Sequence, residues 1–528
     1  MVQTKFECFL KMFAAVKGPQ QLLKHQMLLK MFIGFLSNSD PKTANLAFMC
    51  VGKFKLPYLV PYMDAVQPML KKDGLRESLA KFDLSVDSDS VDAEHRLLLI
   101  PIITRILFGR LSSRSAGTKS SKDSPAGRRA AILSFFSRMG NAQEELTYFV
   151  YMMTRAFIVP GHLNYQLNTQ SGSLASAIKS LNSITKEEIA LVSTQRQVGF
   201  LNLLSDVISQ IGFGVVTAVP VFTNMLLTMS EESQEVFIAN ATRQALKSEE
   251  THDDDESSTQ NNDNQAGRIR TLTFLRLGDL LCKFASAIDF STYGGRLWKA
   301  MSQSLRALPS TVINAENPPS LLRLIENISS HPKLLPLIND SNDVIPAIFR
   351  CIAGTTRMKV MNSVLHIIDN LLTEGGTGGS AQAFGQTHHG ESLILGHIHL
   401  LIAQLNERIM SKISKCDEEA DIKEYIEKGQ TFSSSEGLQL DILCRVSELL
   451  LNDESSCDEH SKTMENLCSL LVPSLKFDTR PNQLHLLKTV ANFIPRLSFN
   501  AAKTHYHALS KVRVLRSNEI NQYNHCTN

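Results

Sequence analysis

The sequence contains few of the residues that build disulfide-stapled or zinc-dependent folds. Only nine of its 528 residues are cysteine, and no two of them form a C-x-x-C pair. A sparse, odd set of cysteines within apolar segments is typical of reduced intracellular thiols. Residues 1–13 lack a sustained apolar core followed by a small-residue cleavage site, so we expect no secretory signal.

An excess of one charge is also missing. Lysine and arginine number 54 against 52 aspartate and glutamate, so the overall charge does not attract the chain to nucleic acid or to a membrane. Two apolar stretches are short or interrupted, since 97–108 contains Arg105 and 213–229 contains Pro220 and Asn224. We expect both to be buried helices, with no membrane contact.

Catalytic and metal-binding motifs are absent as well. No G-x-S-x-G elbow occurs, and the glycine cluster at 375–379 neither follows a strand nor precedes a Lys-Ser/Thr pair. Four histidines lie close in sequence, but one pair is in a loop and the other straddles a helix face, which does not give converging ligands. These are His388, His389, His397 and His399. We therefore predict no enzyme activity, no cofactor, no metal and no small-molecule substrate.

The cysteines give no candidate nucleophile either. None lies in a loop beside a basic residue that would lower its pKa. We expect buried, inert thiols at Cys50, Cys282, Cys351, Cys444 and Cys468.

What the chain does contain is helical periodicity. In residues 271–288 the apolar positions step by three and four, which predicts one buried helix face. Those positions are Phe274, Leu277, Leu281, Phe284 and Ile288. The same rhythm recurs in 442–450 and 484–497, whereas no run of alternating β-branched residues competes with it.

Successive helical segments are separated by short breaks with Pro, Gly, Asn or Ser. A chain of this length exceeds the size at which one core stops growing, and helix pairs without a sharp consensus are typical of HEAT repeats. We predict an all-α fold, a HEAT/armadillo-type α-solenoid of stacked antiparallel helix pairs. A set of unrelated helical bundles remains open.

Composition divides the chain into four parts. We predict a first helical array at 1–247, an acidic disordered linker at 248–267 with almost no apolar residue, a second array at 268–515, and an irregular tail at 516–528. A glycine-rich loop at 374–390 interrupts the second array.

The most informative charged segment is 105–129, in which seven basic residues face the single acid Asp123. They are Arg105, Arg110, Arg114, Lys119, Lys122, Arg128 and Arg129. In a flexible loop at 110–129 such residues could neutralise RNA phosphates or contact an acidic protein, without base recognition because the loop has no aromatic residue. A solvated loop without a specific partner remains the alternative.

Several blocks resemble one family. They are VGKFKLPYLVPYMDAVQPMLKKDGLRESLAKFDLS (51–85), HRLLLIPIITRILFGRL (95–111), RRAAILSFFS (128–137), RQVGFLNLLSDVISQIG (196–212), IRTLTFLRLGDLLCKFASAIDFSTYGGRLWKAMSQSLRALP (269–309) and PPSLLRLIENISSHPKLLPLIN (318–339). In content and order they resemble the down-regulated-in-metastasis family, the small-subunit processome component 20 family. Its members are several times longer, so we expect this chain to be a fragment, an isoform or a truncated gene product.

The resemblance implies a non-catalytic nucleolar scaffold of the small-subunit processome. Its expected partners are those of the pre-ribosomal particle, namely pre-rRNA, small nucleolar ribonucleoprotein and processome proteins, and its expected location is the nucleus and nucleolus. With this resemblance, we expect the segment at 110–129 to contact RNA or ribosomal protein. A karyopherin-like transport solenoid or another HEAT-repeat interaction scaffold, and the helical platform of a TOR-class kinase, remain alternatives.

Overall fold

The structure is a computed structural model of the chain. It describes residues 2–71, 74–85, 88–113, 124–138, 143–158, 184–247, 256–352, 356–374, 389–413 and 434–452, with short pieces at 463, 465–468 and 489–492. Every regular element in these ranges is an α-helix or a short 3-10 helix, and none is a strand. The all-α prediction is therefore confirmed.

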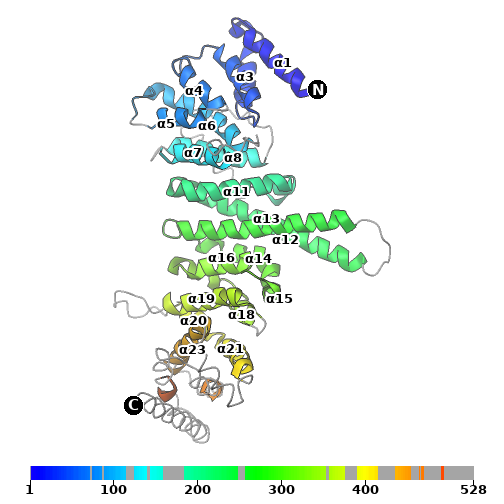
Figure 1. Cartoon of the computed structure of the whole chain (residues 1–528), viewed down its shortest axis with the longest axis vertical. Coiled ribbons are helices and arrows are strands. Elements are labelled where there is room, and N and C mark those ends of the chain that lie inside the picture. The colour runs from blue at the N-terminus through cyan, green and yellow to red at the C-terminus, as the bar shows by residue number, and fades with distance from the viewer. Residues whose placement is uncertain are drawn as a thin grey trace, which may run out of the picture. The chain divides into compact units, whose positions relative to one another are not determined.

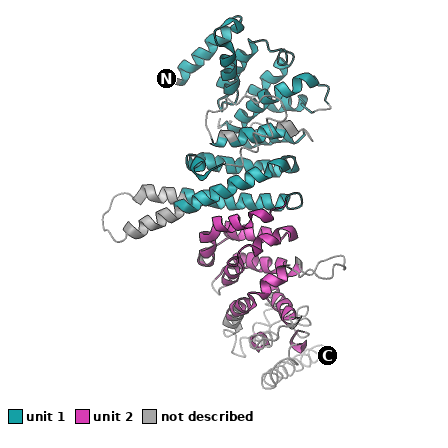
Figure 2. Ribbon diagram, turned by 180° about the vertical axis from the view of Figure 1, so that it is seen from behind, with its two compact units in different colours: residues 1–288 teal, residues 289–528 magenta. Residues whose placement is uncertain are grey.

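The chain forms two compact units (Figure 2), residues 1–288 and residues 289–528. Unit 1 begins with α1 (Val2–Ala15), η1 (Pro19–Gln21), α2 (His25–Phe35), α3 (Pro41–Gly52), η2 (Val60–Tyr62), α4 (Met63–Leu70), α5 (Leu75–Lys81), α6 (Ala93–Ser112), α7 (Pro125–Arg138) and α8 (Gln143–Ile158). It continues with α10 (Lys186–Ala190), α11 (Thr194–Gln210), η4 (Gly212–Ala218), α12 (Val219–Lys247) and α13 (Glu256–Phe284).

Helices of unit 1 stack in two rows (Figure 1). In one row α5 packs on α7, α7 on α11 and α11 on α13, and in the other α6 packs on α8 and α8 on η4, which leads into α12. Each helix buries its apolar face against neighbours in its row and in the other row, as nearest-neighbour stacking in a solenoid requires. The arrangement is consistent with HEAT-type repeats.

Local sequence explains where some helices begin. Pro41 and Pro309 occupy the first turns of α3 and α15 (Leu308–Asn314), where a missing N–H removes no helical hydrogen bond. Asp40 caps α3, because its carboxylate accepts from the backbone N–H groups of Lys42 at 3.3 Å and of Thr43 at 3.0 Å.

The stripe of apolar residues expected to be buried in 271–288 is confirmed over most of its length. Its buried members are Phe274, Leu277, Leu281 and Phe284, whereas Ile288, just beyond the end of α13, is half-buried. The helical period therefore identified the face of α13 that packs into the core.

The acidic segment needs a correction. Its residues 256–267, expected to be a disordered linker, form the start of α13, which packs along α12 as an antiparallel partner (Figure 1). The reason is that a helix nucleated by the apolar positions after 268 can be extended by polar residues. The compact units also divide at 288/289, not within 248–267. Residues 248–255 lie outside the described residues.

The apolar run at 213–229 lies in η4 and α12. Within the described residues it falls in the one segment, Gly212–Val236, that is long and apolar enough to span a membrane by length and composition. Of an apolar 18-residue window within this segment, 61% is buried inside the fold, where Phe222, Met225 and Leu226 are fully enclosed. Packing on α10 and α13 accounts for this apolar surface.

Unit 2 repeats the stacked arrangement. After η5 (Ser291–Tyr293) its elements are α14 (Gly294–Arg306), α15, α16 (Ser320–Ser329), η6 (Pro332–Leu334), α17 (Leu335–Asn339), α18 (Val344–Arg350), α19 (Met358–Glu374), α20 (His389–Leu395), α21 (Ile398–Ile413) and α23 (Ser434–Asn452). One row runs from α16 to α19 to α23, and the other from α15 to α18 to α21. The glycine-rich segment 375–388, the tail 516–528 and most of the stretch 484–497 lie outside the described residues.

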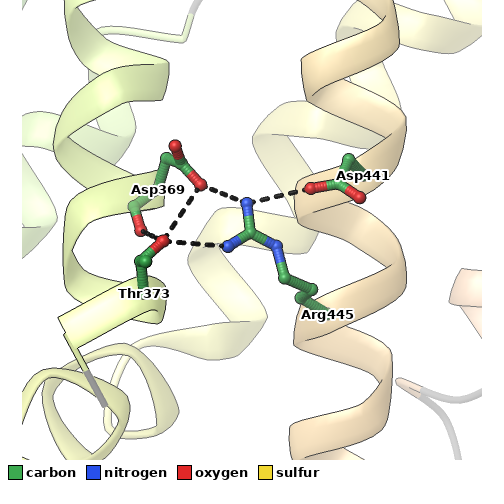
Figure 3. A network of polar contacts seen from close by, with 4 residues as sticks. All are labelled: Asp369, Thr373, Asp441 and Arg445. Atoms are coloured by element: carbon green, nitrogen blue, oxygen red, sulfur yellow. Dashed lines mark hydrogen bonds and ion pairs between the residues drawn. The ribbon is translucent and has the colours of Figure 1, made fainter. Parts of the chain in front are cut away.

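Polar contacts tie the α16–α19–α23 row together. Ser363 of α19 donates to the carboxylate of Glu326 on α16, and Asn370 donates to the hydroxyl of Ser329 at 3.0 Å. On the other side of α19, Arg445 of α23 forms an ion pair with Asp369 (Figure 3). Each of these contacts joins two neighbouring helices of the row.

Candidate nucleic-acid interface

The first two of the seven predicted basic residues are buried. The structure continues α6 through Ser112, so Arg110, expected at the start of the loop 110–129, lies on the same helix as Arg105. Only 5% of the surface of Arg105 and 3% of that of Arg110 is exposed. The residues between them on α6 include the buried apolar side chains of Ile106 and Leu107. The expectation that Arg105 and Arg110 contact RNA is therefore corrected, because neither guanidinium reaches the surface.

Buried arginines of this region bond instead to backbone carbonyl groups of neighbouring elements. Arg110 donates from Nη2 to the carbonyl oxygen of Lys71, the C-cap of α4, at 3.1 Å. Arg96 donates from Nε to the carbonyl oxygen of Leu84 at 2.8 Å. Lys71 lies at the end of α4, where carbonyl groups lack intrahelical partners, so the guanidinium of Arg110 satisfies this acceptor.

Arg105 has a different neighbour, Tyr148 of α8. Burial raises the pKa of the Tyr148 hydroxyl, while the hydrogen bond and positive charge of Arg105 act in the opposite direction. Burial prevails, so Tyr148 stays neutral and can accept from the guanidinium. The pair joins α6 to α8 within one row of unit 1.

Arg128 and Arg129 lie on α7 and differ from each other. Arg128 is half-buried and donates from Nη2 to the carbonyl oxygen of Ser113, the C-cap of α6, at 2.9 Å. Arg129 is exposed, with its Nη1 3.4 Å from an Asp206 carboxylate oxygen on α11. Of the described candidates, only Arg129 is exposed enough to meet a large polyanion. Arg114, Lys119 and Lys122 lie outside the described residues.

Additional basic residues near α7 were missed in the sequence because they lie outside the segment 105–129, either earlier in the chain or at the end of α7. Arg76 of α5 lies against Gly127 at the start of α7, and Arg138 at the end of α7 donates to the carbonyl oxygen of Leu79, 2.6 Å away. We define the α5–α7 basic surface by its exposed members, Lys71, Arg76, Lys81, Arg129 and Arg138. The helices α5 and α7 together contain one acid, Glu77. The excess of positive charge on this surface suits a phosphate backbone.

Burial makes three of the described thiols less acidic. Burial raises the pKa of Cys50 to about 11 and that of Cys351 and Cys468 to about 12. Cys444 is also buried, as expected, whereas Cys282 is only half-buried. His399 places Nδ1 2.7 Å from the Thr463 hydroxyl oxygen, and the described residues contain no cluster of three metal-ligating side chains.

Comparison with known proteins agrees with the family resemblance of the sequence blocks. Residues 1–518 match the model of the family described as U3 small nucleolar RNA-associated protein 20, N-terminal. Over 221 residues the chain is 26% identical to "U3 small nucleolar RNA-associated protein 20" of Schizosaccharomyces pombe, an alignment that covers 41% of this chain and 8% of that protein. The match extends over nearly the whole chain and over both units, and so the chain belongs to the family of the N-terminal region of U3 small nucleolar RNA-associated protein 20.

Proposed function

We propose that this chain is part of a non-catalytic scaffold of the small-subunit processome, which supports pre-rRNA processing and small-ribosomal-subunit biogenesis in the nucleolus. The observation that carries the proposal is the family match over residues 1–518, since the relative's name states an association with U3 small nucleolar RNA. Each unit consists of stacked helices, which suits this role, because a solenoid offers a long contact surface without one closed active site.

The α5–α7 basic surface is our proposal for contact with pre-rRNA in the particle. Its members project from adjacent elements of one unit, and α7 leads back to the segment that contains Arg114, Lys119 and Lys122. A backbone contact of this kind neutralises phosphates and does not read sequence. Base stacking is not expected, because the aromatic side chains of α7, Phe135 and Phe136, are buried.

Association with the particle can be tested in cells by tagging the full-length protein that contains this chain. We expect co-sedimentation with particles that contain U3 RNA, nucleolar staining, and accumulation of unprocessed small-subunit precursor RNA on depletion. A purely cytosolic distribution would contradict the scaffold proposal. Binding to a nuclear-transport GTPase, with shuttling through the pore, would favour the karyopherin-like alternative.

Contact with RNA can be tested with the purified chain and a structured RNA. We expect the combined substitution of Arg76, Lys81 and Arg129 by Ala to weaken binding and to make log affinity less dependent on log salt. The slope should fall by roughly 0.7–0.9 for each phosphate that the variant no longer neutralises. A matched control removes Lys299 and Arg306, two exposed cations of α14 in unit 2. An unchanged salt slope in the first variant would contradict this role for the surface.

A further inference from the structure

The helices α1 and α2 expose large apolar side chains that the fold does not use. Phe9 and Met12 on α1 are 59% and 55% exposed, and Met27 on α2 is 67% exposed. Leu23, in the turn before α2, is 89% exposed. Single exposed apolar residues are common in proteins, but four within the first 27 residues make a local concentration.

The core contacts of α1 and α2 come from different residues. Leu10 and Ala14 of α1 and Phe32 of α2 are buried, and both helices pack on α3. A ring contact at 5.0 Å between Phe6 and Phe35 also joins α1 to α2. Phe9 and Met12 are three residues apart and so share one side of α1, a side that the described helices leave exposed.

The same part of the chain is rich in exposed lysine. Residues 1–55 contain eight lysines, two acids (Glu7 and Asp40) and no arginine, which gives a net charge of 8 − 2 = +6. The lysines are Lys5, Lys11, Lys17, Lys24, Lys30, Lys42, Lys53 and Lys55, and every one of them is exposed. Asp40 caps α3 and Glu7 is half-buried, and with both acids counted the excess of positive charge remains.

We propose that this surface, defined by Phe9, Met12, Leu23 and Met27 with the flanking lysines, binds an acidic amphipathic helix of a protein partner. An apolar stripe on such a helix would cover the four exposed side chains, and carboxylates along its edges would face the lysines. Methionine suits the task because its flexible side chain adapts to the shape of a partner. The incoming helix would stack on α1 and α2 as successive helices of this chain stack on one another.

An RNA strand is a poorer match for the same surface. Phosphates would pair with the lysines but would leave Phe9, Met12 and Met27 exposed to water. Arginine, which recognises phosphate with a bidentate fork, is absent from residues 1–55. A lipid surface is also disfavoured, because α1 and α2 direct their principal apolar sides toward α3.

The experiment uses the purified 528-residue chain and a fluorescent synthetic peptide of about five helical turns, ~18 residues, with a leucine stripe flanked by glutamates. We expect saturable binding that weakens as salt rises, because screening removes the lysine contribution. Replacing Phe9 and Met27 with Ala should weaken binding about tenfold while helicity and thermal stability stay the same. Replacing Lys5, Lys24 and Lys30 with Glu should weaken it at least as much at low salt.

Matched controls separate this surface from nonspecific charge. The variant Lys299→Glu with Arg306→Glu changes exposed cations of unit 2 and should leave peptide affinity within about twofold. A peptide in which lysines replace the glutamates should bind only weakly. Equal weakening in the control variant would overturn the proposal.

Three further probes test the other occupants. Single-stranded RNA, phosphatidylcholine–phosphatidylserine vesicles and sedimentation of the chain alone report on nucleic acid, lipid and a second copy. The proposal would be overturned if the peptide did not bind and the double variant Phe9→Ala with Met27→Ala abolished binding of RNA or of vesicles. A dimer of the chain that the same double variant disrupts would overturn it as well. The peptide assay does not involve the pre-ribosomal particle, so its failure leaves the proposed function untouched.

Discussion

Gly109 of α6 lies against the backbone of Asn38, just after α2. A β-carbon at position 109 would come 2.7 Å from the Asn38 carbonyl oxygen and 3.0 Å from the Ser37 carbonyl carbon. Both atoms belong to the main chain, so the clash cannot be relieved by a rotamer change. The α6 backbone can thus approach the residues that follow α2 because glycine at position 109 has no side chain.

We predict that Gly109→Ala lowers the free energy of unfolding by about 1–3 kcal/mol, because it overpacks a fixed contact. The matched control is Gly199→Ala in α11, where a β-carbon meets nothing within 4 Å. That change should stabilise the chain by about 0.5–1 kcal/mol through helix propensity. Thermal unfolding, with hydrogen exchange across α6, measures both. Equal stability of the two variants would show that the contact with Asn38 does not constrain position 109.

The buried guanidinium of Arg110 gives a second prediction. Replacing Arg110 with Met keeps much of the volume but removes the donor to the Lys71 carbonyl group, which we expect to cost about 1–3 kcal/mol. Arg129→Ala, at an exposed site, should change stability by less than about 0.5 kcal/mol. RNA affinity should fall more in Arg129→Ala than in Arg110→Met. Weaker RNA binding by a fully folded Arg110→Met protein would contradict the structural role.

The sequence predicted the helices of this fold better than it predicted its surface. Spacing of Phe274, Leu277 and Leu281 identified a buried face because the helical period is a local property. The role of Arg110 could not be found in this way, since the carbonyl group that it satisfies is 39 residues earlier in the chain. Counting charges along 105–129 treated buried and exposed arginines alike, and only tertiary packing distinguishes them.

The segment 256–267 illustrates a second limit. Its composition is typical of disorder, because it has almost no apolar residue to bury. A helix can nevertheless extend outward from a packed stretch, and α13 does so from the buried positions that begin at Ile269. Composition reports what a segment cannot bury, whereas helix propagation depends on what lies next to it.

Asp40 gives α3 a predictable pH dependence. Partial burial raises its pKa, but hydrogen bonds from Thr43 and from the Lys42 backbone outweigh burial and hold the pKa below the ordinary value of 3.8. The lowered pKa contributes stability that is present above pH 3.8 and is lost as the pH falls through the folded-state value. We expect Asp40→Ala to cost about 1 kcal/mol near neutral pH and less in acid. Asp40→Asn, which also caps helices, should lose less and remove the pH dependence.

Thiol chemistry should separate the cysteines by burial. Cys8 is exposed, whereas Cys50 is buried, with its pKa raised to about 11 and its Sγ 3.3 Å from the Leu10 carbonyl oxygen. Since the thiolate is the reactive form, a disulfide reagent at mild alkaline pH should modify Cys8 quickly and Cys50 only on unfolding. Cys8→Ser should remove this fast reaction. Rapid labelling of Cys50 in the folded chain would contradict its burial.

The raised pKa values of the buried thiols also predict how stability changes at alkaline pH. A thiol whose folded-state pKa is raised stabilises the fold at pH values below the unfolded pKa of 9.0, and this contribution is lost as the pH rises toward the folded value of about 11 for Cys50 or about 12 for Cys351. We expect stability to fall progressively above pH 9.0, and Cys50→Ala with Cys351→Ala to reduce the slope of that fall. Unfolding curves measured on either side of this window check the prediction. An identical slope in the double variant would assign the alkaline loss to other groups.

The network around Arg445 offers a test of how the helices of unit 2 hold their register. Arg445 on α23 pairs with Asp369 on α19, donates to the Thr373 hydroxyl at 3.2 Å, and also pairs with Asp441 one turn earlier at 2.9 Å (Figure 3). Both carboxylates are partly exposed, at 31% and 39% of their side-chain surface, so screening limits each pair. The contact to Asp369 crosses between helices, whereas the contact to Asp441 stays within one.

A double-mutant cycle distinguishes the two pairs. We expect a coupling energy of about 0.5–1.5 kcal/mol between Arg445→Ala and Asp369→Asn, and about 0.3–0.5 kcal/mol between Arg445→Ala and Asp441→Asn, the range for an i,i+4 pair on a helix. Arg445→Lys should lose most of the coupling to Asp369, because a lysine cannot reach the carboxylate and the Thr373 hydroxyl with one planar fork. Hydrogen exchange in α19 and α23 supplies the measurement. Equal coupling to Asp369 and Asp441 would mean that the guanidinium stabilises α23 itself and does not fix its position on α19.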